Sequence, residues 1–257
     1  RRTMMKKQIS GGLAGILAMV LLAGCAKGID NPENYKTIVD DYAVFTLEQD
    51  GDSAAFDEAL GAVGLYLEDY DDNSLQNARS IVEKTLNNME AEAADTPSYE
   101  LSSDLAAILN EYGLDEEEYV INANMRVSYL SEYIDSLKTL QYYLDLELQE
   151  DRDLLRDDLE FLYQFQTACQ TCERGYYYYS INYWFAGWEG SQKEYVEEKV
   201  IRHLKSYAAE NAVWEDNREA VEQKMSLYLD QIQELGNRMQ EHIGRSREEL
   251  YRMEQTQ

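Results

Sequence analysis

The chain has 257 residues, of which 44% are hydrophobic and 11% aromatic, and its formal net charge at pH 7 is −27. Four of the 23 basic residues and none of the 50 acidic ones lie within residues 1–24, so the chain from residue 25 onward has a net charge of −31. Such a body is repelled by phosphate backbones, which excludes nucleic acid as an expected partner. The aromatic content and the recurring apolar spacing favour a packed core over a disordered chain.

The first 24 residues have the three parts of an export signal. Two lysines precede an apolar run from Ile9 to Leu22, which is too short to cross a bilayer comfortably. The run ends in the small residues Ala23 and Gly24, directly before Cys25. We therefore expect residues 1–24 to be a cleaved signal peptide and not a buried helix.

Leu22, Ala23, Gly24 and Cys25 resemble the lipobox of bacterial lipoproteins. The resemblance implies that a signal peptidase recognises the first three residues, cuts before Cys25 and leaves a lipid on the Cys25 sulfur. Residues 25–32 would then form a lipidated tether, and the covalent lipid would be the only cofactor. The anchor would lie on the extracytoplasmic face of the plasma membrane, or on the outer membrane of a cell that has two.

The mature chain is expected to be all-α. It contains only two prolines, Pro32 and Pro97, and both lie beside predicted helix starts, where proline is tolerated. We predict an elongated antiparallel bundle of about seven helices with coiled-coil-like seams. Residues 33–257 would form one domain. The alternative is a division into an N-terminal helical subdomain, 33–113, and a long-helix bundle, 114–257.

Two helices are predicted before the first acidic linker. One begins after Pro32 and ends at the run from Asp50 to Ser53, and the next continues to about Tyr70. Apolar residues at three-four spacing predict the buried faces of both helices. These residues are Tyr35, Ile38, Tyr42 and Phe45, followed by Phe56, Leu60, Val63 and Leu67.

A third helix is predicted to begin at Asn73 and Gln76, which stand three apart as in a capping box. A fourth is predicted from Pro97 to Gly113, where glycine can take the left-handed conformation that closes a helix. Their predicted core residues are Leu75, Ile81, Val82, Leu86 and Met89, then Leu101, Leu105, Ile108 and Tyr112.

The middle of the chain has two longer apolar seams. We expect the chain to turn between them, near Gln149 to Asp153, because one continuous helix would leave its seam without an intramolecular partner. Each seam predicts either an ordinary core stripe or a surface that pairs with another chain. The first consists of Val120, Ala123, Val127, Leu130, Ile134, Leu137, Gln141, Leu144 and Leu148, and the second of Leu155, Leu159, Leu162, Gln166 and Cys169.

A final long helix is predicted to begin at Ser191, which forms a capping box with Glu194. Its later half repeats the apolar pattern and so predicts a third seam. The residues of that seam are Val221, Met225, Tyr228, Ile232, Leu235 and Met239.

No catalytic residue can be assigned, because the motifs of nucleophilic, nucleotide-dependent and metal-dependent enzymes are absent from the sequence. His203 and His242 stand outside any zinc or di-iron spacing, so no metal is expected. Asp69, Asp71 and Asn73 resemble the opening of a calcium loop, but the glycine and the closing glutamate of that loop are missing.

Cys169 and Cys172 are candidates for a disulfide or for thiol redox chemistry, because an exported protein meets an oxidising setting. Their predicted place near a helix C-terminus opposes formation of a thiolate. Structural cysteines are therefore the preferred interpretation, and a metal site would need further ligands that the sequence does not identify.

Eight aromatic residues fall between positions 176 and 188, and they allow two interpretations. Tyr178, Tyr183, Trp184 and Trp188 are candidates for an exposed patch that stacks on sugar rings. The four-three-four spacing of Tyr177, Ile181, Trp184 and Trp188 instead predicts a buried helical stripe, which we prefer.

Together these features predict a membrane-anchored extracytoplasmic lipoprotein. It would be a non-enzymatic helical adaptor, spacer or binding module, with the membrane and a protein or cell-wall component as partners. The alternatives are an accessory enzyme, a thiol redox protein that uses Cys169 and Cys172, or a glycan-binding lipoprotein that uses the aromatic cluster.

Overall fold

The computed structural model describes residues 32–149, 152–210 and 212. Every regular element in these ranges is helical, which confirms the predicted all-α bundle. The predicted signal peptide, Cys25 and the third seam lie outside the described residues. In chain order the elements are α2 (Pro32–Asp69), α3 (Asp72–Asp95), α4 (Ser103–Glu111), α5 (Glu116–Gln149), α6 (Arg152–Trp184), α7 (Gly190–Val196), the π-helical turn η1 (Glu197–Ile201) and the 3-10 turn η2 (Lys205–Tyr207).

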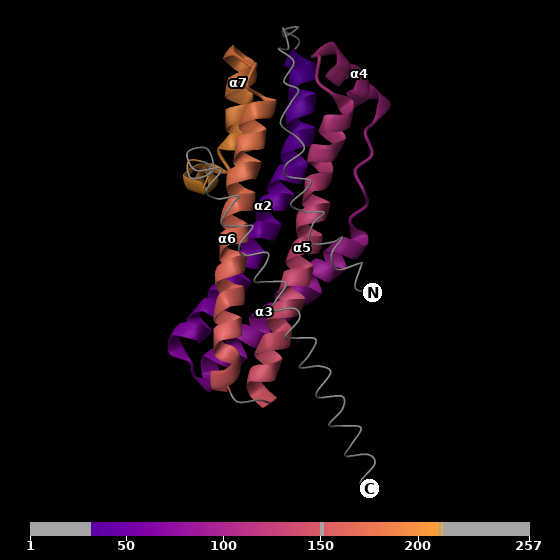
Figure 1. Cartoon of the computed structure of the whole chain (residues 1–257). Coiled ribbons are helices and arrows are strands. Elements are labelled where there is room, and N and C mark those ends of the chain that lie inside the picture. Colours follow the sequence, from indigo (N-terminus) through magenta and orange to yellow (C-terminus); the bar gives the residue numbers. More distant parts are fainter. Residues whose placement is uncertain (1–31, 150–151, 211, 213–257) are drawn as a thin grey trace.

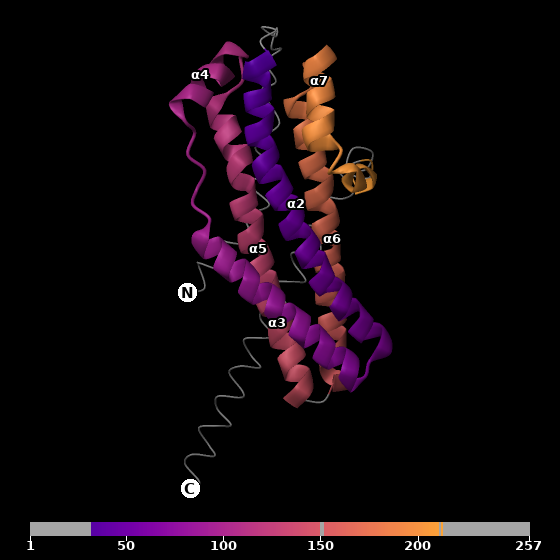
Figure 2. The same cartoon turned by 180° about the vertical axis from the view of Figure 1, so that it is seen from behind.

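Three long helices, α2, α5 and α6, run lengthwise beside one another (Figure 1). α5 and α6 run in opposite directions, so the chain turns between Gln149 and Arg152, as predicted. α3 packs across α2 and α5 near one end, while α4 and α7 lie at the other end, where α2 begins (Figure 2). The 38 residues of α2 span about 57 Å at about 1.5 Å per residue, so the bundle is elongated.

α2 continues through the run from Asp50 to Ser53, so the predicted break there is wrong. Asp52 faces inward and accepts a hydrogen bond of 2.8 Å from Arg126. Ser53 also faces inward and accepts one of 2.5 Å from Gln170. These tertiary contacts outweigh the tendency of Asp, Gly and Ser to end a helix. Because the helical spacing is uninterrupted, the predicted apolar faces on both sides of the run lie in the core, except that Leu67 at the end of the second face is only partly buried.

The junction between α2 and α3 uses Tyr70, whose φ is 51°. Asp71 then caps α3, because its carboxylate accepts a hydrogen bond of 2.8 Å from the backbone N–H of Ser74. The Ser74 hydroxyl bonds back to the Asp71 N–H and completes a capping box. The predicted box at Asn73 and Gln76 is therefore wrong, since the stronger acceptor Asp71 starts the helix two residues earlier.

Pro97 does not open a helix, because the chain after α3 is not helical until Ser103. Tyr99 fixes this segment to the bundle by donating a hydrogen bond of 2.6 Å to Asp41 of α2. Ser102 is the N-cap of α4 and accepts a bond from the backbone three residues on. Gly113 has a φ of 68° just after α4, as predicted for a helix terminus.

The buried face of α5 is wider than the predicted seam. Val127 and Leu148 of that seam are 37% and 40% exposed. The helix packs against α2, α3 and α6, so residues on both sides of the seam are buried instead. Among them are four tyrosines, Tyr119, Tyr129, Tyr133 and Tyr143.

α7 is short, and the predicted capping box at Ser191 is not formed. The helix begins at Gly190 and has Glu189 as its N-cap residue, with no hydrogen bond from the cap side chain. Gly190 has a φ of 54°, which sets the chain direction one residue before the predicted start. After Val196 the helix passes into the π-helical turn η1.

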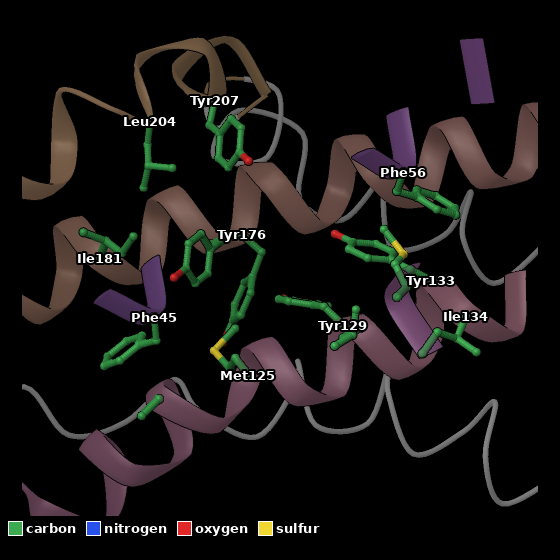
Figure 3. Packing of buried hydrophobic residues seen from close by; sticks show 14 of the residues in the cluster. Phe45, Phe56, Met125, Tyr129, Tyr133, Ile134, Tyr176, Ile181, Leu204 and Tyr207 are labelled. Atoms are coloured by element: carbon green, nitrogen blue, oxygen red, sulfur yellow. The ribbon is translucent and has the colours of Figure 1, made fainter. Parts of the chain in front are cut away.

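The core of the described bundle is rich in aromatic rings. Phe56 of α2 stacks on Tyr133 of α5, with ring centroids 4.6 Å apart. Tyr129 and Tyr133 project from α5 toward α6, and Tyr176 projects from α6 toward α5 (Figure 3). Several of these rings bear hydroxyl groups, so the core brings polar atoms into the interior, where each needs a hydrogen-bond partner.

Candidate functional site

The two cysteines of the described bundle lie in the middle of α6, not near its end, because the helix continues to Trp184. No disulfide joins them, and Cys169 is one helical turn before Glu173. Burial raises the pKa of the Cys169 thiol well above its usual range, and the charge of Glu173 raises it further. A thiol held in its protonated form is a poor nucleophile, so this environment disfavours redox chemistry at Cys169.

The aromatic cluster contributes mostly to the core. Trp184 and Trp188 are 8% and 3% exposed, and they pack against Tyr119 and Tyr112 respectively. Their rings therefore offer no open face to a sugar, contrary to the glycan-binding hypothesis for these two residues. The other two candidates, Tyr178 and Tyr183, are half-buried, and Tyr183 stacks on Tyr179 with centroids 6.0 Å apart.

A buried polar layer lies between α2, α5 and α6, at a place where the sequence suggested only packing. The Tyr133 hydroxyl is at its centre. It accepts a hydrogen bond of 3.4 Å from the Gln49 amide of α2. Burial raises the pKa of Tyr133 well above its usual range, and the charge of Glu173 of α6 raises it further. The hydroxyl of this α5 tyrosine is therefore bonded to α2 and influenced by a charge on α6.

Glu173 of α6 and Glu132 of α5 are half-buried, and the charge of Glu132 acts on Glu173 across the α5–α6 interface. Burial raises the pKa of Glu173 well above its usual range, and the neighbouring Glu132 raises it further. Burial and the charge of Asp135 likewise raise the pKa of Glu132. Both effects disfavour the doubly ionised state of the pair.

Several oxygen atoms of this layer receive no hydrogen bond from the described residues. They include the amide oxygens of Gln49 and Gln170, the hydroxyl of Tyr129 and the Oε2 atom of Glu173. The first three side chains are only 3–4% exposed. Burial raises the pKa of Tyr129 well above its usual range, and the charges of Glu173 and Glu132 raise it further. Several polar atoms of the layer thus lack a hydrogen-bond partner among the described residues.

Arg174 forms the edge of the layer nearest to η2. Its guanidinium group donates to the Asp57 carboxylate and, at 3.1 Å, to the Ser53 hydroxyl. The same group lies over the Tyr207 ring, 5.2 Å from its centroid. Tyr207 donates a hydrogen bond of 2.7 Å to Asp50. The Arg174 guanidinium group therefore binds Asp57 and Ser53, and no hydrogen bond joins it to Glu173 in the described part of the chain.

A second arginine connects α5 to α2 and α3. Arg126 donates to Asp52 and Glu48 of α2 at 2.8 Å each, and to Glu92 of α3. Only 7% of the Arg126 side chain and 6% of the Asp52 side chain are exposed. Burial raises the pKa of Asp52 despite the contact with Arg126, and the charges of the two glutamates add to that rise.

A sequence signal for this layer exists but is weak. Gln49 and Asp52 continue the three-four spacing of the apolar stripe of α2 after Phe45. Glu173 stands four residues after Cys169, the last residue of the second predicted seam. Extending both stripes across polar residues would have placed these side chains in the interior.

The described residues contain no cluster of three or more histidine, cysteine or acidic side chains arranged to hold a metal ion. His203 is exposed at the turn after η1. None of the helices described here has both the length and the apolar character needed to cross a bilayer. Comparison with family models, with curated proteins and with solved structures finds no match to this chain.

Proposed function

We propose that the protein is a lipid-anchored extracytoplasmic lipoprotein whose acidic helical bundle acts as an adaptor, spacer or binding module for a protein or cell-envelope component. The observation that carries this proposal is the Leu22–Cys25 lipobox at the end of an apolar leader. The lipid on Cys25 would hold the chain at the membrane surface, and the bundle would extend away from it.

The position of α2 supports this arrangement. Six residues separate Cys25 from Pro32, so the two Cα atoms can be at most about 25 Å apart. Pro32 lies at the end of the bundle that also carries α4 and α7 (Figure 1). That end would therefore be close to the membrane, and the junction of α2 with α3 would be far from it.

Charge supports an extended orientation. The end of the bundle near Pro32 carries the exposed acidic residues Glu33, Asp104, Glu111 and Glu117. Anionic lipid headgroups repel such a surface, whereas the acyl chains of a lipidated cysteine bind the bilayer. A spacer that stands away from the membrane fits these charges better than a domain that lies flat on it.

The anchor is tested by mass spectrometry of the full chain produced in a bacterium. We expect a mature N-terminus at Cys25 that carries the mass of a lipid, and a C25S variant that keeps residues 1–24 and gains no lipid. C172S is the matched control and should be processed as the wild type is. An unmodified Cys25 still joined to Gly24 would refute the proposal.

The adaptor role is tested by cross-linking in intact cells. The reference is an unrelated domain fused to the same residues 1–31, which reports neighbours that any anchored protein would meet. We expect the complete chain to enrich a defined protein or wall component over that reference. Equal capture by the complete chain and by the reference would refute the adaptor role and leave only the lipid anchor as a proposal.

A further inference from the structure

The outer side of α2 carries an exposed stripe at the spacing of a coiled-coil seam. Val44, Leu47 and Leu65 are 57%, 42% and 55% exposed, and they are three of the six large apolar side chains that are exposed in the described residues. Four further exposed residues continue the same alternating steps of three and four, so all seven lie along one side of the helix. The members of this outer stripe are Val44, Leu47, Gly51, Ala54, Glu58, Gly61 and Leu65.

The outer stripe takes no part in holding the bundle together. The residues that follow Gly51 face inward, where Asp52 accepts a hydrogen bond from Arg126 of α5 and Ser53 accepts one from Gln170 of α6. Successive residues of a helix are turned by about 100°, so Gly51 and the rest of the stripe point away from those two helices. This is the side of α2 that Figure 2 shows. It is therefore open to a partner.

Two glycines of the outer stripe have no use in the fold. Glycine destabilises a helix relative to alanine, and a Cβ atom built on Gly51 or Gly61 meets nothing within 4 Å. Ala54, which is also exposed, adds only a methyl group to the surface between them. The stripe thus has a low centre between the larger side chains Leu47 and Leu65. Such a profile allows the backbone of a second helix to approach α2 closely.

Charge selects the kind of helix that fits. Residues 37–69 include nine acidic side chains and no lysine or arginine. One of the acids, Glu58, is exposed within the outer stripe itself, and Asp40 is exposed just before it. A second copy of this chain would present the same acids and be repelled, and so would an anionic lipid surface. A segment with basic side chains beside its apolar seam is attracted instead.

We propose that the outer stripe of α2 is a docking surface for an amphipathic helix of another protein, one with an apolar seam at four-three spacing and basic residues beside it. Val44, Leu47 and Leu65 pack between the side chains of that seam, and Glu58 pairs with one of the basic residues. The stripe covers 21 helical steps, or about 32 Å at about 1.5 Å each, so the partner segment has about three heptads. The inference rests on the proposed adaptor role and specifies its surface and its class of partner.

The surface is tested by repeating the cross-linking comparison with variants of the full chain. L47N and L65N remove apolar contacts, and G51L fills the low centre without meeting another part of the fold. We expect each to reduce enrichment of the captured partner at least about tenfold, because the contacts of one buried leucine are worth that much. I121N is the control, since Ile121 is 43% exposed on α5 and should capture as the wild type does.

Two negative results of that comparison have different meanings. If the wild type enriches a partner and all three variants of the stripe enrich it equally well, the docking surface is refuted and the adaptor role stands. If the wild type captures no more than the reference, the adaptor role itself is refuted. Circular dichroism of the purified variants should show unchanged helicity, because every substituted position is exposed.

The class of partner is tested by a photo-cross-linking amino acid at position 47. We expect it to capture a protein segment with a four-three apolar seam and basic flanks. A synthetic peptide of that segment should bind the purified full chain, at least about tenfold more weakly in L47N, and more weakly in E58K or as salt is added. Capture of a second copy of this chain, of lipid, or of a segment with acidic flanks would overturn the proposal.

Discussion

At the scale of single residues, Asp41 shows how this tyrosine-rich core satisfies its hydroxyl groups. Its Oδ2 atom accepts hydrogen bonds of 2.6 Å from Tyr99 and 2.7 Å from Tyr119. Burial raises the pKa of both tyrosines, and the bonds to Asp41 raise it further. Both hydroxyls therefore remain donors through the whole neutral and mildly alkaline range. One carboxylate on α2 thus holds the segment before α4 and the start of α5.

We expect D41A to lower the free energy of unfolding by about 1–3 kcal/mol, because the Tyr119 hydroxyl is left in the interior without its acceptor. D41N keeps an acceptor oxygen and should lose less. D40A is the control, since Asp40 accepts a bond of 2.8 Å from Tyr195 at the surface. Urea unfolding measures all three. Equal losses of unfolding free energy in D40A and D41A would show that the loss does not depend on burial of the tyrosine hydroxyl.

The glycines inside α2 allow a second residue-scale prediction. A Cβ atom built on Gly51 or Gly61 meets nothing within 4 Å, whereas one on Gly64 would come within 2.8 Å of the Tyr163 hydroxyl. We expect G51A and G61A each to stabilise the fold by about 0.5–1 kcal/mol, since alanine is the better helix former. G64A should not gain, because the Tyr163 ring must move. Thermal unfolding compares the three, and a gain in G64A equal to the others would refute this account.

At the scale of elements, Arg126 joins three helices. It lies on α5 and binds carboxylates of α2 and α3, with Asp52 as its buried partner. We expect R126A to lower the free energy of unfolding by about 3–5 kcal/mol, because it leaves the Asp52 charge in the interior without compensation. K138A removes an exposed ion pair and should cost no more than about 1 kcal/mol. Guanidinium unfolding measures both.

The double variant R126L/D52L separates the cost of a broken pair from the value of an intact one. Replacing both partners removes the two desolvated charges together, so the double variant should be more stable than R126A. A double variant as unstable as R126A would mean that Glu48 and Glu92 depend on the arginine as much as Asp52 does.

The elements themselves were largely predictable where an apolar stripe runs without polar interruption. Tyr35, Ile38, Tyr42 and Phe45 all lie in the core as their spacing predicts. The run from Asp50 to Ser53 was misleading, because its helix-breaking tendency is local while Arg126 and Gln170 come from distant helices. A single sequence contains no information about which partner a polar residue will meet.

The polar layer was missed for the same reason. Glu173 follows the second seam at helical spacing, but a glutamate in an acidic chain is normally a surface residue. Its half-buried position depends on the register of α6 against α5, which is set by the whole interface. The buried Trp184 and Trp188, in contrast, agree with the preferred interpretation of their spacing.

At the scale of the whole molecule, net charge opposes compactness. A body that carries a net charge of −31 from residue 25 onward repels itself, and salt screens that repulsion. The Debye length falls from about 30 Å at 0.01 M to about 8 Å at 0.15 M ionic strength. We therefore expect Tm to rise as NaCl is added over this range. KCl should act equally, and a fall in Tm would show that attractive ion pairs outweigh the repulsion.

The aromatic contacts between helices also make the bundle a spectroscopic reporter of its own assembly. Tyr119 of α5 lies 5.9 Å from Trp184 of α6, and Tyr112 lies 5.8 Å from Trp188, measured between ring centroids. Light absorbed by a tyrosine at such a separation is passed to the indole and emitted as tryptophan fluorescence. If α6 moves away from α5, this transfer falls and tyrosine emission appears, so the spacing of the two helices can be followed without an added dye.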